Sequence, residues 1–150
     1  MLPDRREDRM NQQQHEGRDA YVAFQEGSRL LAEDNAHAAV VALERARALE
    51  PAQGSVREAL ARAYFRTGRF AQAEVEFQAA VDIDPVNDYA HYGLGVCRLR
   101  VGNRAGARGP LKLATVMRPD NAHYGRALAE ASAGDALDAV DGADASEAAE

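Results

Sequence analysis

Three prolines, Pro51, Pro85 and Pro119, are equally spaced along the chain and define a 34-residue period. Alignment on these prolines gives three units, which cover 20–53, 54–87 and 88–121. Small residues recur at three positions of the unit: Gly27, Ala61 and Gly95 at position 8, Ala39, Ala73 and Ala107 at position 20, and Ala46, Ala80 and Ala114 at position 27. A period of this length predicts one supersecondary motif that is repeated along the chain.

Each unit has the pattern of two short helices joined by a turn. Apolar residues share one face in each half of the unit at ~100° per residue. Position 15, between the two halves, holds the turn-forming residues Asp34, Gly68 and Gly102. The proline near the end of the unit cannot continue a helix, so it ends the second one. Ser55 and Glu58 also predict a capping box in the second unit. The chain is therefore predicted to be all-α and built from helical hairpins.

This pattern resembles the tetratricopeptide repeat (TPR), a helix-turn-helix unit of the same period. The best copy is 54–87, which carries Leu60, Ala61, Tyr64, Ala73, Phe77, Ala80 and Pro85 in the slots of the family. The resemblance covers 20–133 and implies a right-handed α-solenoid of three repeats followed by a capping helix at 122–133. The chain has 17 Arg and one Lys, a bias typical of GC-rich genomes, and we expect a small bacterial member of the family.

The tetrapeptide AHYG occurs twice, at 90–93 and at 122–125. The spacing of the two copies is shorter than the period of the repeat. In the 34-residue register His91 takes position 4 and His123 takes position 2, so the two copies should face different ways. We therefore interpret the tetrapeptide as a coincidence. The histidines of the chain lack the spacing of metal ligands, and we expect neither a metal nor a cofactor.

The third unit departs most from the family pattern. Arg98 replaces the tyrosine of position 11, and the second half of the unit contains Gly106, Gly109 and Pro110. A proline inside a helix costs ~3 kcal/mol relative to alanine, and a glycine costs ~1 kcal/mol.

The net charge of the chain lies in the segment that follows the repeats. The formal net charge is −6, and the six acids of 135–150, which has no basic residue, account for all of it. We predict a disordered polar segment over 1–19 and a disordered acidic tail over 134–150. The tail could compete weakly with an acidic partner peptide, or it could only aid solubility. The amino terminus lacks the apolar segment of a secretory signal, so we expect a cytoplasmic protein.

The resemblance implies that the first helices of the repeats line a concave groove. Positions 2, 5, 9, 12 and 13 lie on the side of these helices away from the buried stripe. The predicted groove residues are Tyr21, Phe24, Leu31, Arg62, Phe65, Arg66, Tyr89, Tyr92, Val96, Arg100 and Arg126. Because aromatic residues and arginine are enriched in binding hot spots, this face predicts a peptide-binding site.

We therefore interpret the chain as a protein-protein interaction module, an adaptor or scaffold, with a peptide partner of unknown identity. The Lys, Asn and Arg residues with which some TPR domains clamp a terminal carboxylate are absent, since those slots hold Phe24, Ser28, Ala59, Tyr89 and Gly93. No catalytic motif is present, and we expect no enzyme. Self-association through the open first end of the array is an alternative, and RNA binding through the Arg-rich third repeat is a weaker one.

Overall fold

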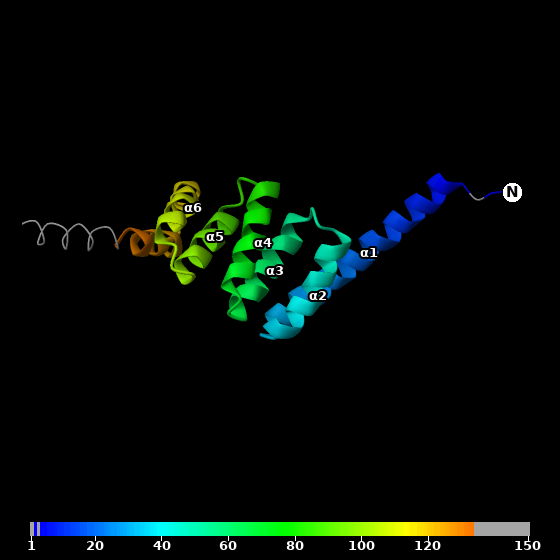
Figure 1. The fold of residues 1–150 in the computed structure, drawn as a ribbon, viewed down its shortest axis with the longest axis horizontal. Helices are drawn as coiled ribbons and strands as arrows, with labels where there is room; N and C mark the ends of the chain where they lie inside the picture. Colours follow the sequence, from blue (N-terminus) through cyan, green and yellow to red (C-terminus); the bar gives the residue numbers. More distant parts are fainter. Residues whose placement is uncertain (1, 3, 134–150) are drawn as a thin grey trace, which may run out of the picture. The chain divides into compact units, whose positions relative to one another are not determined.

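The computed structural model describes residues 2 and 4–133, and this part of the chain contains helices and connecting segments (Figure 1). The helices are α1 (Arg5–Ala32), α2 (Ala36–Leu49), α3 (Gly54–Arg66), α4 (Phe70–Ile83), α5 (Asp88–Arg100) and α6 (Arg104–Met117). Residues 122–133 are also helical and are called the cap helix below. The acidic tail predicted at 134–150 lies outside the described residues.

The 34-residue period is preserved in the helices. The second helix of each hairpin begins at Ala36, Phe70 or Arg104, so the three starts have the same spacing as the prolines. Each hairpin turns at position 15, where Asp34, Gly68 and Gly102 have φ angles of 60°, 78° and 83°. Glycine adopts this left-handed conformation without steric cost, and aspartate tolerates it better than most residues do. The predicted all-α fold of three hairpins followed by a capping helix is confirmed.

The chain forms two compact units, and the first, Met1–Pro85, contains α1 to α4. Within it α2 packs against both α1 and α3, and α3 packs against α4. The glycine of position 8 explains how closely α1 and α2 approach. A Cβ atom on Gly27 would lie 2.4 Å from Cγ of Leu43, a residue with no exposed surface. The small residues at this position are therefore required by the packing of the hairpin.

A buried carboxylate joins the first two hairpins within this unit. The Glu76 side chain on α4 is 3% exposed and forms ion pairs with Arg47 of α2 and Arg57 of α3. Arg57 Nη1 lies 2.9 Å from Glu76 Oε2. Burial alone lowers the pKa of Arg47, but the hydrogen bond and the negative charge of Glu76 outweigh it and raise that pKa. One acid thus holds two arginines from different helices in place.

The second unit, Val86–Glu150, contains α5, α6 and the cap helix. The cap helix buries Ala127 and Ala131 in one cluster with Ala107 and Leu111 of α6. A helix that covers the last hairpin in this way meets the need of a repeat array for a terminal cap.

The two AHYG copies lie in different environments in this second unit. In the first copy His91 is buried and Tyr92 is half-buried, whereas in the second His123 is exposed and Tyr124 is buried. The interpretation of the tetrapeptide as a coincidence within the 34-residue register is therefore confirmed.

Helix α6 continues through Pro110 because another residue satisfies the backbone group that the proline leaves open. Proline has no N–H to donate to the carbonyl of residue 106. Instead, Arg98 Nη1 donates to the Gly106 carbonyl at 2.9 Å. The arginine at position 11 and the proline inside the helix are thus two departures from the family pattern that fit each other.

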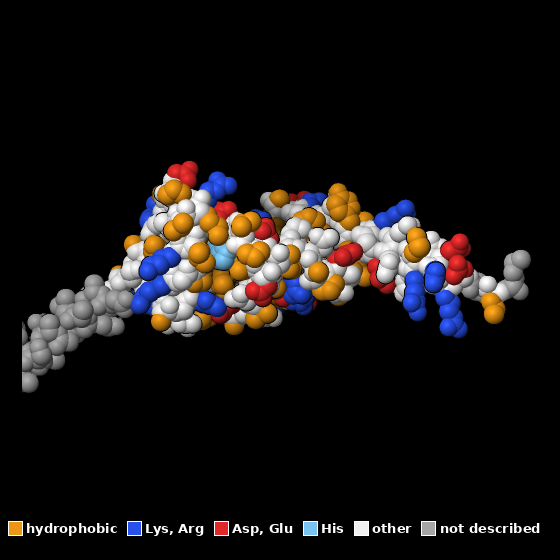
Figure 2. Space-filling view, turned by 90° about the horizontal axis from the view of Figure 1, so that it is seen from above, with side chains coloured by type: hydrophobic (Ala, Val, Ile, Leu, Met, Phe, Trp, Pro, Cys, Tyr) orange, Lys and Arg blue, Asp and Glu red, His pale blue; other side chains and the backbone are white. Residues whose placement is uncertain are grey.

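Two local expectations differ from the structure. Residues 5–19 of the segment for which we predicted disorder are instead part of α1, which begins at Arg5 and is capped by Asp4. Its first part carries charged side chains of both signs and no buried stripe, so capping and helix-forming residues maintain it (Figure 2). The predicted capping box at Ser55 is also wrong, because α3 begins at Gly54 and Ser55 lies inside the helix.

Candidate functional site

The predicted groove residues lie on the first helices of the three hairpins, except Arg126, which lies on the cap helix. Each of the two compact units has a hollow of its own. In the first unit, a hollow of about 210 Å³ lies between α1 and the start of α3. We call it the α1–α3 pocket. Its lining residues are Gly17, Ala20, Tyr21, Phe24, Glu50, Gln53, Ser55 and Val56. Two of the predicted groove residues, Tyr21 and Phe24, thus lie side by side in one pocket.

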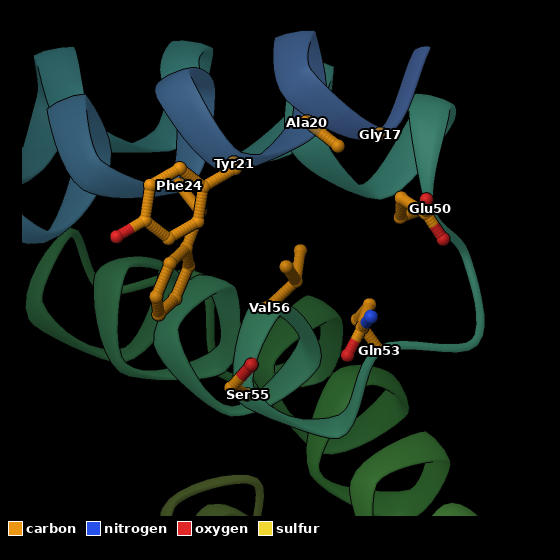
Figure 3. A pocket seen from close by; sticks show the side chains of 8 residues that line it. All are labelled: Gly17, Ala20, Tyr21, Phe24, Glu50, Gln53, Ser55 and Val56. Carbon is orange, nitrogen blue, oxygen red and sulfur yellow. The ribbon is translucent and has the colours of Figure 1, made fainter. Parts of the chain in front are cut away.

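The α1–α3 pocket has an apolar side and a polar side. Figure 3 shows Tyr21 and Phe24 together at one side, Val56 in the centre, and Glu50 and Gln53 at the other side. Val56 is buried and Phe24 packs against it, whereas Tyr21 is 61% exposed. Gln25 Nε2 donates to the Tyr21 hydroxyl at 2.9 Å, which restrains the ring. The pocket can hold an apolar side chain of a bound peptide, and the adjacent residue of that peptide can then reach the Glu50 carboxylate.

In the second unit, a hollow of about 330 Å³ lies between α5 and the cap helix. We call it the α5–cap pocket. Its lining residues are Tyr92, Val96, Leu99, Arg100, His123, Arg126, Ala127 and Glu130. Four of the predicted groove residues, Tyr92, Val96, Arg100 and Arg126, therefore line it.

The α5–cap pocket carries cationic groups next to aromatic ones. Arg126 Nη2 lies 2.9 Å from Nδ1 of His123. Tyr92 stacks on Tyr124 with ring centroids 4.7 Å apart, and the Tyr124 hydroxyl donates to Asp88 Oδ2 at 2.6 Å. Burial, together with this hydrogen bond, raises the pKa of Tyr124 well above that of a free tyrosine. Tyr92, stacked on the fixed ring of Tyr124, therefore forms a wall of the pocket that Arg100 and Arg126 also line.

The other predicted groove residues have structural contacts or lie outside these two pockets. Leu31 is wrong as an exposed groove residue, because it is only 4% exposed. The carboxyl end of α1 lies against α3, where Arg66 Nη1 donates to the Leu31 carbonyl at 2.8 Å. Phe65 packs edge-to-face on Phe70, with centroids 5.1 Å apart. Arg62 is half-buried, and the ring of Tyr89 is 6.2 Å from that of Tyr92.

Sequence reasoning missed several pocket residues, namely Gly17, Glu50, Gln53 and Glu130. Glu50 and Gln53 belong to the turn between α2 and α3, where helical periodicity carries no information. Gly17 falls in the segment for which the sequence predicts disorder. Glu50 and Gln53 could have been located from the sequence, because they lie at the end of the first repeat, just after its second helix.

The described residues contain no cluster of three or more His, Cys, Asp or Glu side chains that could hold a metal ion. The single cysteine, Cys97, is buried in α5. Among the helices of the described segment, none has the length and apolar character needed to cross a membrane.

The chain belongs to the tetratricopeptide repeat family. Two family models, both described as tetratricopeptide repeat, match residues 30–85 and 59–122. Together the matches run from 30 to 122, which is more than half of the chain. No curated protein matches the sequence.

Solved structures show the same fold. The first TPR of Spaghetti (RPAP3), bound to the HSP90 peptide SRMEEVD, is similar with 21% identity and a TM-score of 0.75, over 79% of this chain and 94% of that one. The second TPR domain of human RPAP3, in complex with the HSP70 peptide SGPTIEEVD, has 19% identity and a TM-score of 0.73, over 78% and 98%. YrrB, described as a TPR protein with an unusual peptide-binding site, has 24% identity and a TM-score of 0.68, over 72% and 56%.

Proposed function

We propose that this chain is an adaptor that binds an extended peptide segment of a partner protein through the first helices of its repeats. One observation carries the proposal: in both units, partly exposed aromatic side chains at the groove positions line a hollow on a first helix. Exposed aromatic residues beside arginine are the usual composition of a binding hot spot. Peptide binding by the similar RPAP3 domains supports the same class of function.

The chemistry of the two pockets suggests what the partner segment carries. The α1–α3 pocket is apolar on the side of Tyr21 and Phe24 and suits a large aliphatic or aromatic side chain. The α5–cap pocket presents Arg100 and Arg126 and suits an acidic side chain. Because the residues of the carboxylate clamp are absent, the partner segment does not need to be the end of a chain.

Selection of peptides from a random display library against the full chain tests this proposal. Peptides that bind should lose at least ~tenfold in affinity with Phe24→Ala and with Tyr92→Ala, measured by fluorescence polarisation. Val116→Ala serves as the control, because Val116 is 78% exposed on α6 and outside both pockets. Equal affinity of the selected peptides for all three variants and the original chain would reject the proposed site.

A further inference from the structure

The outer face of the first hairpin is a second candidate surface, separate from both pockets. It forms a shallow hollow of about 490 Å³ whose walls include Val22, Glu26 and Leu30 of α1 and Val41, Ala42 and Arg45 of α2. Val22 is 61% exposed and Val41 is 72% exposed. We call this surface the hairpin face.

The second hairpin shows what normally happens to such a face. Val56 is the residue of α3 at the repeat position of Val22, and it is only 4% exposed. It is buried because it packs with Ala23 and Ala46 of the preceding hairpin. Leu60, at the position of Glu26, has no exposed surface. The α1 side of the hairpin face is therefore a surface that this fold covers with another helical hairpin where one precedes it. On the α2 side, Val75 at the repeat position of Val41 stays 63% exposed in the second hairpin.

We infer that the hairpin face is a self-association surface and that its occupant is the same face of a second copy of this chain. A closed pair requires a surface that is complementary to itself after a two-fold rotation. The hairpin face meets this requirement because its acids, Asp19 and Glu26, lie on α1 and its base, Arg45, lies on α2.

The heights of these residues along the hairpin set the arrangement of the pair. Helices α1 and α2 are antiparallel, and Gly27 lies against Leu43. Measured along the helix axes, Glu26 therefore lies within one turn of Arg45, and Leu30 lies within one turn of Val41. A two-fold axis parallel to the helices places α1 of one copy on α2 of the other without changing any height. Glu26 then meets Arg45 of the second copy, and Leu30 meets Val41 of the second copy.

The alternative two-fold axis, perpendicular to the helices, is disfavoured by charge. It would lay α1 on α1 of the second copy, so that Asp19 and Glu26 would face acids of the same kind. Because like charges that face each other across an interface repel, this second arrangement is less stable than the first. Arg29 pairs with Glu26 at 2.9 Å and with Glu33 at 2.8 Å and forms a polar rim beside the apolar centre.

The size of the hairpin face sets the expected strength. Twelve residues of helix span ~18 Å, and two helices side by side are ~20 Å wide. The face therefore offers roughly 350–400 Å² per copy, about half of the ~800 Å² in a standard stable interface. The association should be weak and reversible, with a dissociation constant between ~1 µM and ~1 mM.

Sedimentation velocity of the full chain from ~10 µM to ~1 mM tests this inference. The matched variants are Val41→Asp on the hairpin face and Val75→Asp at the same repeat position of α4, where the valine is 63% exposed. Val41→Asp should weaken association at least ~tenfold, whereas Val75→Asp should change it less than ~twofold. Circular dichroism verifies that both variants stay folded.

The charge pair gives a second, independent measurement. Glu26→Arg and Arg45→Glu should each weaken association, and the double variant should restore it to within ~twofold, because the opposite charges meet again. A chain that stays monomeric at ~1 mM would overturn the inference, and so would equal effects of Val41→Asp and Val75→Asp. A double variant no better than the single ones would overturn the proposed arrangement. None of these measurements uses a partner peptide, so they stand apart from the test of the proposed function.

Discussion

Glu76 and Pro110 occupy the same position of the second and third repeats, and different arginines accommodate them: two for Glu76 and one for Pro110. In the second repeat the Glu76 carboxylate is buried and pairs with Arg47 and Arg57. In the third repeat Pro110 leaves the Gly106 carbonyl without its helical donor, and Arg98 takes that place. The two repeats therefore keep one backbone shape with different interactions. A departure from the family pattern at one position can be balanced by a second departure on another helix.

Removal of the Glu76 carboxylate should have the largest effect. Glu76→Ala leaves two partly buried arginines without their acid and should lower the free energy of unfolding by ~2–3 kcal/mol. Asp82→Ala is the control on the same helix, because Asp82 is exposed and only accepts a hydrogen bond from Gln78. Urea unfolding followed by circular dichroism measures both. A loss below ~0.5 kcal/mol for Glu76→Ala would mean that the ion pairs contribute no net stability.

The same substitution at two glycines of the third repeat should act in opposite directions. In Gly95→Ala the new Cβ would lie 2.5 Å from Cγ of Leu111, so we expect a loss of ~1–2 kcal/mol. In Gly109→Ala the new Cβ meets no atom within 4 Å, so the better helix propensity should add ~1 kcal/mol. Thermal unfolding compares the two variants. Effects of the same sign would contradict the close approach of α5 and α6.

A double-mutant cycle on Arg98 and Pro110 should show a coupling of ~1 kcal/mol. Arg98→Leu alone leaves the Gly106 carbonyl without a donor and should destabilise the protein. In the Pro110→Ala background residue 110 has an N–H again, so Arg98→Leu should cost less. Chemical denaturation of the four proteins gives the coupling. Equal costs of Arg98→Leu in both backgrounds would show that the hydrogen bond does not compensate for the proline.

The sequence was enough to predict the hairpins because their helical pattern is repeated three times. The small residue at position 8 and the turn residue at position 15 both have direct structural causes, such as the approach of Gly27 to Leu43 and the positive φ of Asp34. The first part of α1 was missed because a helix without an apolar stripe has no periodicity to detect.

The pockets were predicted only in part, for a related reason. Periodicity selected Tyr21, Phe24, Tyr92 and Arg126, which line the two pockets, but it gives no position for the turn residues Glu50 and Gln53. It also considers each helix alone, so it could not foresee that Leu31 would be buried or that its carbonyl would accept a hydrogen bond from Arg66 of α3. The contact of Arg98 with Gly106 was missed in the same way, because it joins two helices.

The smallest expected effect concerns a feature that the two compact units share: in each, a tyrosine hydroxyl donates a hydrogen bond to a carboxylate. Tyr64 donates to Glu44 in the first unit, and Tyr124 donates to Asp88 in the second. Burial, strengthened by the neighbouring acid, raises the pKa of both tyrosines. The folded state therefore holds these protons more tightly than the unfolded state does. The stability they contribute is fully present below the unfolded pKa of ~10 and is lost as the pH rises above it.

Replacement of Tyr124 tests this pH dependence. Tyr124→Phe should flatten the fall in stability above pH ~10, and it should remove one late-ionising group from the absorbance titration of tyrosinate. At neutral pH the lost hydrogen bond should cost only ~1 kcal/mol. Tyr21→Phe is the control, because the Tyr21 ring is 61% exposed. If Tyr124→Phe removes a group that ionises in the same pH range as the one lost in Tyr21→Phe, and leaves the alkaline stability profile unchanged, the hydrogen bond to Asp88 does not hold the Tyr124 proton. The fixed aromatic wall of the α5–cap pocket would then depend on the stacking of Tyr92 and Tyr124 alone.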